Sequence, residues 1–437
     1  MEGKAIKREV MRTVSNRTII SRTYYDINVE MTSPTNVGGG RTVNTDADVL
    51  RNRRGEVFIP GSSLAGAFRN FIGDELDKAS VFGFSSDEKG TMSSLMISDL
   101  YFIPETVKVS IRDRVSLDDT KIVDNKFDLE VLEAGARGTI HIETIHRESM
   151  EDPSEYIDSI ILALNEGDIR LGAVKNRGFG RVRVIDIRQK VFKRDDREEW
   201  IKYLSGDEET QGSAVAFDDW KEDRNFEPKF EKHTQTLRLQ GGISIRKYSA
   251  EPGKPDYEHI TSNGEPVIPG TSWNGAIRSG AKKILRDLGL KAEDAEKLLQ
   301  DWFGKKREKE DDRSKNNASW QSRIVFAESV IKGSKMLPMT RNNINRFTAG
   351  AKSSALYTEL TCIGGETELE YMVRKDKYQL AIEGMMKLVV KDLCMGFVPV
   401  GGLTAVGRGV FAGECEEISA DDECIKKLYE EVRRYTR

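Results

Sequence analysis

Apolar and polar side chains alternate with a period of two at several places along the chain. TYYDINVEM at 23–31 and TLRLQGGISI at 236–245 show this pattern, as do RGTIHIETI at 137–145 and ETELEYMV at 366–373. A period of two is typical of strands with one buried face. Each pair has one member in each half of the chain, so the two halves share a strand pattern.

A helical period of apolar residues occurs twice in each half. It predicts helices at 62–78 and 158–167 in the first half, and at 271–288 and 379–393 in the second. Further strands are expected at 94–102, 182–188, 323–331 and 410–418. Each half then has the order β-α-β-β-α-β of a ferredoxin-like fold, so the predicted class is α+β.

Two sequence phrases also repeat in the same order. IPGSSLAGAFR at 59–69 matches IPGTSWNGAIR at 268–278, and GAVKNRGFGRV at 172–182 matches GGLTAVGRGVF at 401–411. Two motifs in the same order indicate an internal duplication. We refer to the two copies as the first and second repeat.

The duplication predicts two domains joined by a connector. The first domain covers 1–194, the acidic connector 195–232, and the second domain 233–437 with a C-terminal helix at 420–435. The charged run at 305–319 has no apolar period and is expected to be a solvated loop.

The repeated motifs have features suited to phosphate. In each IPG motif a Ser or Thr is placed to cap a helix N-terminus, where free amides and the helix dipole favour an anion. The first glycine loop adds Lys175 and Arg177 to its backbone amides, whereas the second adds only Arg408. These features point to a phosphate-rich partner.

Composition limits where such a partner can bind. The net charge is −4, from 68 basic and 72 acidic residues. A nucleic-acid site must therefore be local, because general phosphate binding favours a basic protein. No run of about 18 apolar residues is present, so no membrane span is expected. The four cysteines include no CxxC pair, which suits a reducing cytoplasm and argues against disulfides or structural zinc.

Taken together, the motifs resemble a known family. They are SPTNVGGG (33–40), TDADVLRNRRGEVFIPGSSLAGAFR (45–69), VSIRDRVSLDD (109–119), GAVKNRGFGRV (172–182), GEPVIPGTSWNGAIR (264–278) and TRNNINRFTAGAKSSALYTELTCIGG (340–365). In this order they resemble the RAMP superfamily, specifically the backbone subunits of type III CRISPR–Cas effector complexes, as two fused copies.

The resemblance implies a fold and a set of partners. It implies two tandem modified ferredoxin-like (RRM-like) RAMP domains, each with a thumb hairpin that flips a base out of the guide–target duplex. The implied partners are guide RNA (crRNA), target RNA and other type III effector subunits. The implied activity is metal-dependent endoribonuclease cleavage of target RNA, with Mg²⁺ or another divalent cation.

The resemblance also implies site residues. A loop aspartate upstream of IPG aligns with Asp46, or with Asp48 as a fallback, and in the second repeat with Asp256. Asp46 lies 13 residues before Ile59, whereas Asp256 lies 12 before Ile268. The candidate RNA contacts are Ser62, Ser63, Arg69, Arg112, Arg114, Lys175, Arg177, Ser272, Arg278, Arg341, Arg346 and Arg408, with Arg114 matched to Arg346.

The thumbs are expected at 114–133 and 346–360. Their candidate wedges are Phe127, Leu129, Phe347 and Leu356.

Other functions remain open at this point. The chain can be a guide-binding scaffold without cleavage, or a guide-processing endoribonuclease acting by metal-free acid–base chemistry. The latter is disfavoured because no histidine stands near either glycine loop. A generic RNA-binding scaffold outside CRISPR would require both repeated motifs to be coincidental.

Overall fold

The computed structural model describes most of the chain as two compact units. The described residues are 18–40, 46–73, 81–86, 89–117, 123–148, 150–206, 212–248, 254–305, 321–352 and 356–436. Most of the run predicted as a charged loop at 305–319 lies outside them.

The division of the chain into units differs from the predicted one. The first unit comprises residues up to 110, 130–173 and 180–228; the second comprises 111–129, 174–179 and residues from 229 onward. The predicted connector therefore belongs to the first unit as far as residue 228. In addition, two stretches of the first repeat belong to the second unit.

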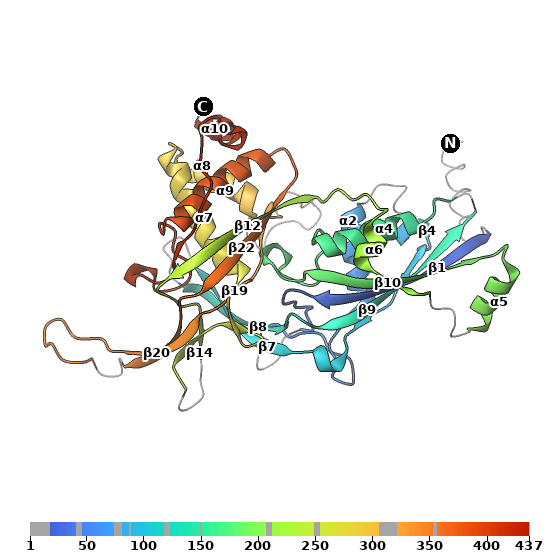
Figure 1. Ribbon diagram of the computed structural model, residues 1–437, viewed down its shortest axis with the longest axis horizontal. Helices are drawn as coiled ribbons and strands as arrows, with labels where there is room; N and C mark the ends of the chain where they lie inside the picture. The colour runs from blue at the N-terminus through green and yellow to red at the C-terminus, as the bar shows by residue number, and fades with distance from the viewer. Residues whose placement is uncertain are drawn as a thin grey trace. The chain divides into compact units, whose positions relative to one another are not determined.

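The first unit is built on a five-stranded sheet of order β11-β10-β1-β9-β5 (Figure 1). Its strands are β1 (Ile19–Met31), β5 (Leu95–Ile97), β9 (Arg137–Arg147), β10 (Val182–Lys193) and β11 (Ala214–Ala216). The four strands of the repeat thus stand in the order 4-1-3-2, and all their pairings are antiparallel.

Two helices cover one face of this sheet. They are α2 (Gly61–Ile72) and α4 (Ser154–Glu166). On that face Ile27 of β1 lies between Ile140 and Ile187 of its neighbours, and all three are buried. The alternating sequence pattern thus corresponds to one face packed under helices and one face left polar.

The segment predicted to be a connector contributes two helices to this unit, α5 (Arg197–Ser205) and α6 (Phe217–Lys221). Phe217 and Trp220 of α6 are buried in the first unit's core. Their burial explains why the segment belongs to this unit: it contributes two aromatic side chains to its interior.

The second unit repeats the arrangement on a four-stranded sheet of order β18-β22-β12-β23. Its strands are β12 (Phe230–Gln240), β18 (Ile324–Phe326), β22 (Glu366–Arg374) and β23 (Val410–Ala412). Its helices are α7 (Gly270–Asp287), α8 (Ala292–Phe303), α9 (Gln379–Cys394) and α10 (Glu423–Thr436). The strand order is again 4-1-3-2, so both repeats have the predicted ferredoxin-like fold.

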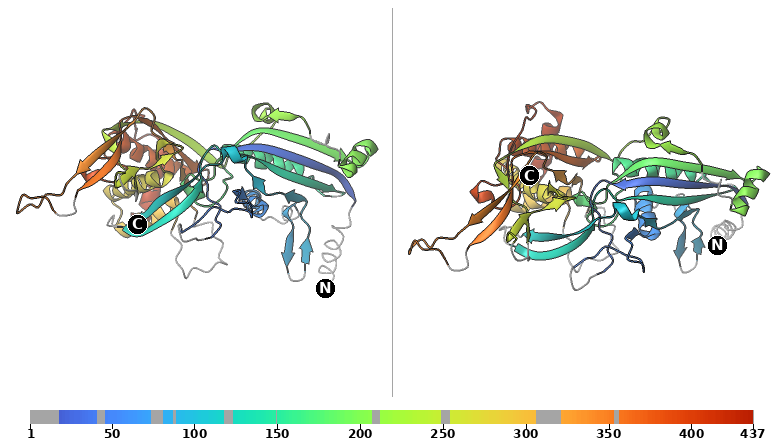
Figure 2. Two further views of the ribbon diagram at one scale, coloured as in Figure 1. Left: turned by 90° about the horizontal axis from the view of Figure 1, so that it is seen from below. Right: turned by 60° about the horizontal axis from the view of Figure 1, so that its bottom comes forward.

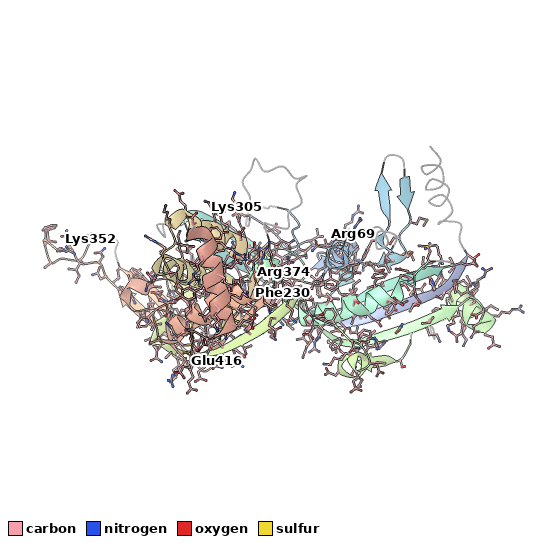
Figure 3. The ribbon with its side chains drawn as sticks, turned by 90° about the horizontal axis from the view of Figure 1, so that it is seen from above. Arg69, Phe230, Lys305, Lys352, Arg374 and Glu416 are labelled. Atoms are coloured by element: carbon pink, nitrogen blue, oxygen red, sulfur yellow. The ribbon has the colours of Figure 1, made fainter. Side chains whose placement is uncertain are left out.

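The pairing of the two inner strands of the second sheet can be followed in Figure 3, where Phe230 opens β12 beside Arg374 at the end of β22. The Arg374 guanidinium lies over the Phe230 ring, 5.7 Å from its centroid. This contact closes one end of the pairing between the first and third strands of the repeat.

Each repeat also has a long hairpin. In the first repeat it is β7 (Val109–Leu117) with β8 (Val123–Leu132), and in the second it is β20 (Lys335–Arg341) with β21 (Tyr357–Ile363). Figure 2 shows the second hairpin projecting from its unit, and Lys352 marks the loop at its end (Figure 3). Both hairpins begin before the predicted thumbs. The first predicted thumb, 114–133, includes the end of β7 and all of β8, whereas the second, 346–360, begins after β20 and includes only the start of β21.

Short elements complete the fold. In the first repeat they are β2 (Phe58–Ile59), β3 (Phe84–Ser86), β4 (Lys89–Thr91), β6 (Leu100–Tyr101), η2 (Pro104–Thr106) and η3 (Lys175–Arg177). In the second they are β13 (Gly242–Ile243), β14 (Arg246–Tyr248), β15 (Tyr257–His259), β16 (Thr261–Ser262), β17 (Glu265–Ile268), β19 (Ser329–Val330) and η6 (Thr404–Val406).

Candidate functional site

The helix starts after IPG differ from the expected capping arrangement. Both helices begin at the glycine, with Pro60 or Pro269 as the N-cap residue, and neither N-cap residue makes a side-chain capping hydrogen bond. Ser62 and Ser63 therefore lie inside the first turn of α2 with exposed side chains. The expected Ser cap is wrong because proline ends the extended segment one residue before the glycine that opens the helix.

A carboxylate already occupies the N-terminus of α2. Asp99 accepts a hydrogen bond of 2.8 Å from the Gly61 amide. The helix dipole and a free amide favour this placement. A phosphate at the same amide would meet negative charge, so the structure does not support the expected anion site at this helix start.

Asp99 and Glu328 hold the same position in the two repeats, two residues after β5 and β18 respectively. Glu328 has a different role from Asp99. It forms a bidentate ion pair with Arg112 of β7, in which Nη2 donates to Oε1 over 3.2 Å. Arg112 is 3% exposed and also lies over the Phe179 ring. Arg112 is thus not placed to contact RNA, and we withdraw it as a candidate.

The glycines of both motifs lie against protein backbone. A side chain at Gly61 would meet the Ile97 carbonyl at 2.4 Å, and one at Gly180 would meet the Leu171 carbonyl at 1.9 Å. Gly409 meets Val400 in the same way at 1.8 Å. Since backbone atoms cannot yield to a side chain, these glycines are required by the fold itself.

The first glycine loop also packs against the second repeat's IPG helix within the second unit. A side chain at Gly178 would lie 2.3 Å from the Phe326 carbonyl, and one at Gly270 would lie 2.5 Å from the Arg177 carbonyl. The matching loop of the second repeat is different. Gly407 has nothing within 4 Å of its missing side chain among the described residues.

The remaining candidate RNA contacts differ in exposure. Arg177 and Arg346 are exposed, whereas Arg69, Lys175, Ser272, Arg278, Arg341 and Arg408 are half-buried. Desolvation lowers the pKa of Lys175. Several half-buried groups contact protein: Arg69 donates to the Gly83 carbonyl, Arg278 pairs with Glu296, and Arg408 contacts the Met339 sulfur. Arg69 is marked on α2 in Figure 3.

The proposed match of Arg114 to Arg346 also changes. Arg114 lies in strand β7, whereas Arg346 lies in the loop beyond β20. Arg341, in the last position of β20, is the nearer counterpart. The Arg114 side chain lies outside the described residues.

The two aspartate loops can be aligned through their backbone hydrogen bonds. The Leu50 amide donates to the Val37 carbonyl over 2.8 Å, and the Ile260 amide donates to the Ile245 carbonyl over 2.9 Å. Each acceptor lies just beyond the repeat's first strand. Leu50 and Ile260 therefore occupy the same position in the two repeats.

Asp46 and Asp256 each stand four residues before those positions, and both are exposed at a bend. The one-residue difference in spacing to IPG falls later, in the turns at 51–57 and 261–266. The second turn is a tight hairpin between β16 and β17. The shorter spacing therefore does not separate Asp256 from Asp46.

The Asp46 loop is held by residues of its own repeat. Glu130 of β8 accepts from the Val49 amide over 2.9 Å and pairs bidentately with Arg51. The Arg51 hydrogen bond lowers the pKa of Glu130. Asp48 is half-buried, and its backbone bonds to Gly39 and Gly40. Asp48 thus forms part of the loop's packed side, and Asp46 is the more exposed of the two carboxylates.

The Asp256 loop has an aromatic surround that the sequence reasoning missed. Tyr257 makes edge contacts with Tyr248 and Tyr357, each with ring centroids 6.1 Å apart. The Arg246 guanidinium lies over the Tyr257 ring, 4.7 Å from its centroid. Asp256 itself accepts from the Thr358 amide over 2.8 Å. Tyrosines on both sides of a loop were the available sequence signal.

A buried polar cluster lies beneath this loop. Glu359 is fully buried and is bound by the Ser244 hydroxyl and, over 3.3 Å, by the Arg246 guanidinium. His259, at the position of Val49, accepts from the Ile245 amide and bonds to the Val267 carbonyl. Burial lowers the pKa of His259 to about 4, so it is neutral at pH 7.

The candidate wedges on the hairpins separate clearly by exposure. Phe347 is 95% exposed and Leu356 is 68% exposed, whereas Leu129 is 5% exposed and Phe127 is half-buried. The Asn345 side chain accepts from the Phe347 and Thr348 amides, which fixes the turn behind Phe347. Phe347 is therefore the wedge candidate that the structure presents, and Leu129 is a packing residue.

The donor groups suit a metal only in part. Within the described ranges, no three His, Cys, Asp or Glu side chains gather into a metal-binding group. Each loop offers one exposed carboxylate, which fits Mg²⁺ when substrate phosphates supply further oxygens. In the same part of the chain, no helix is both long and apolar enough to cross a membrane.

Comparison with known proteins agrees with the repeated fold. The model of the RAMP superfamily matches residues 28–183 and 249–412, one match in each repeat. Among curated proteins, no match was found. The superfamily comprises RNA-binding subunits associated with CRISPR, some of which are ribonucleases. With two matched copies that cover most of its length, the chain belongs to the RAMP superfamily.

Proposed function

We propose that the chain is a crRNA-binding backbone subunit of a type III CRISPR–Cas effector, and that it cleaves target RNA at two positions with Asp46 and Asp256. The observation that carries this proposal is the equivalent placement of the two aspartates, each exposed and four residues before the same backbone hydrogen bond. Two equivalent carboxylates predict two cuts on one bound RNA. The proposed setting is the cytoplasm.

In each loop the carboxylate acts on the RNA 2′-hydroxyl. It accepts a hydrogen bond from that hydroxyl and orients the oxygen in line with the scissile phosphorus. When a divalent cation is bound, it would supply charge stabilisation at the phosphate. Asp46 and Asp256 would supply the protein ligand in their respective repeats.

Guide binding rests on fewer cations than the sequence predicted. Arg177 and Arg346 are exposed, as are the hydroxyl-bearing Ser62 and Ser63 on α2. Phe347 is placed to insert beside a base, since an exposed aromatic on a firm turn loses little entropy on stacking. Tyr248, which is 56% exposed beside the Asp256 loop, is a second stacking surface.

A partly inactive subunit is the second candidate. The hydrogen bond from the Thr358 amide already uses one Asp256 oxygen, which favours a structural role in the second repeat. The metal-free processing enzyme gains no support, since His259 is buried, neutral and bound at both ring nitrogens.

The test is a reconstituted complex with guide RNA and labelled target. Asp46→Asn and Asp256→Asn should each remove one product, with about a 100-fold or greater loss at that position, while guide binding stays unchanged. Asp421→Asn, an exposed surface change, is the control. EDTA should abolish both cuts. Normal cutting by the double variant would refute the assignment, and loss of only the Asp46 product would support the partly inactive subunit.

A further inference from the structure

Strand β7 of the first repeat's hairpin contacts the second repeat's aspartate loop. Within the second unit, the Asp113 carboxylate accepts a hydrogen bond of 3.0 Å from the Tyr248 amide. The neighbouring Arg112 is fixed by its buried pair with Glu328. Successive residues of a strand point to opposite faces, so β7 is held on one face and reaches β14 from the other.

The Tyr248 amide needs such a partner because β14 lies at the edge of its sheet. The strand order there is β13-β21-β15-β14. An edge strand has backbone amides that no neighbouring strand satisfies. Asp113 satisfies one of them with a charged acceptor, which gives a stronger hydrogen bond than a neutral acceptor would.

Strand β14 in turn fixes the residue next to Asp256. Tyr248 pairs with Tyr257 across β14 and β15, and their rings are in edge contact. Tyr257 follows Asp256 directly. A shift of β14 at Tyr248 would therefore be transmitted to the Asp256 backbone through one strand pairing and one ring contact.

The first repeat has a different support. The Asp46 loop is held by Glu130 and Arg51, both of the same repeat. The Asp256 loop is bonded within its own repeat by the Thr358 amide. Through Tyr248 it also has a contact with Asp113, which is 135 residues away from Tyr248 in the chain. The Asp256 loop is thus supported by residues of both repeats.

We propose that Asp113 is a positioning residue for the Asp256 loop, so that the first repeat's hairpin speeds cutting by the second repeat. This rests on the proposed cleavage function. Asp113 touches no RNA in the proposal and acts through the Tyr248 amide alone. Its removal should slow one cut and leave the other unchanged.

Two measurements on the full chain test this. Hydrogen exchange of the free protein should show about 5- to 10-fold faster exchange at Tyr248 in Asp113→Ala, as expected for the loss of one such hydrogen bond. Exchange over 254–259 should rise with it. Asp113→Asn keeps an oxygen acceptor and should restore most of the protection, and Asp421→Ala is the surface control.

In the reconstituted complex, Asp113→Ala should lower kcat for the Asp256 product about 3- to 10-fold, with KM and the Asp46 product unchanged. An unchanged product ratio, or unchanged exchange over 254–259, overturns the proposal. If the native complex cuts no RNA, the proposed function fails, and the exchange over 254–259 alone decides whether Asp113 positions the loop.

Discussion

The middle glycine of the glycine loop is packed against protein in the first repeat, whereas its counterpart in the second repeat has open space around it among the described residues. The packed glycine is Gly178, which lies against the Phe326 backbone, and its counterpart is Gly407. The arginine beside the loop also comes from a different element in each repeat. In the first repeat Arg112 of β7 lies over the ring of Phe179 in the loop, whereas in the second repeat Arg408 belongs to the loop itself and contacts Met339 of β20. Two loops with matching glycines therefore have different surroundings, and a repeated motif does not imply a repeated role.

The acidic residue that follows the second strand of each repeat, Asp99 or Glu328, also differs in role. Asp99 caps a helix amide in the first repeat, while its counterpart Glu328 holds a buried arginine in the second. One position thus serves a local bond in one repeat and a long-range bond in the other. Four predictions test how far this difference extends.

The largest effect is expected at the buried ion pair. Glu328→Ala leaves the Arg112 guanidinium buried without its carboxylate, which should lower the free energy of unfolding by about 3 to 5 kcal/mol. Asp99→Ala removes one helix-cap bond and should cost about 1 kcal/mol. Denaturant unfolding of both variants measures the contrast. Equal losses would mean that the two acids are not used differently.

The next effect compares the two glycine loops. Gly178 and Gly407 both have positive φ, +86° and +82°, so alanine should strain either backbone by about 1 to 2 kcal/mol. Gly178→Ala should cost about 2 kcal/mol more, because its Cβ meets the Phe326 carbonyl. Thermal and denaturant unfolding report the difference. A Gly407→Ala variant as unstable as Gly178→Ala would show that its loop is packed too.

The third effect is a pH dependence that arises from His259 of the second repeat. The pKa of His259 is about 4 when folded, against an ordinary 6.5. Its stabilising contribution is therefore fully present above pH 6.5 and is lost as the pH falls toward 4. About 2 kcal/mol should be lost by pH 5. His259→Val introduces the residue type found at Val49. In this variant the free energy of unfolding should change less with pH between pH 7.5 and pH 5. An unchanged slope would contradict this.

The smallest effect on stability is expected at the hairpin tip. Phe347→Ala should change the free energy of unfolding by less than about 0.5 kcal/mol, because the ring is 95% exposed. Leu129→Ala, in the other hairpin, should cost about 2 to 5 kcal/mol. If Phe347→Ala also weakens target cleavage while Ser205→Ala does not, the exposed ring has a functional role. A marked loss of stability would instead show that the ring is packed.

The sequence was sufficient for the fold because its signals are local. Alternation and helical periods predicted the four sheet strands and two helices of each repeat, and α8 was missed. The strands expected at 94–102, 236–245 and 323–331 are each interrupted, and the strand expected at 410–418 ends at Ala412. The domain borders were less accurate, since Phe217 and Trp220 look like isolated aromatics until they are seen in a core. No local pattern could show that 111–129 and 174–179 belong to the second unit.

The candidate site was only partly predictable. The equivalent placement of Asp46 and Asp256 could not be predicted from their spacing to IPG, because the one-residue difference arises in the turn that follows each loop. Arg112 looked like an RNA contact because its partner, Glu328, is 216 residues away. The glycines looked like phosphate-binding elements because the carbonyls that they face come from distant strands.

The division of the chain has a consequence for anyone who would separate the repeats genetically. A gene divided at codon 229 would yield a C-terminal polypeptide that lacks 111–129 and 174–179, two segments of its own folded unit. The N-terminal polypeptide would carry those segments with Arg112 parted from Glu328. The C-terminal polypeptide would then need the N-terminal one to complete its folded unit, and the second repeat could not be transferred alone as a self-sufficient domain.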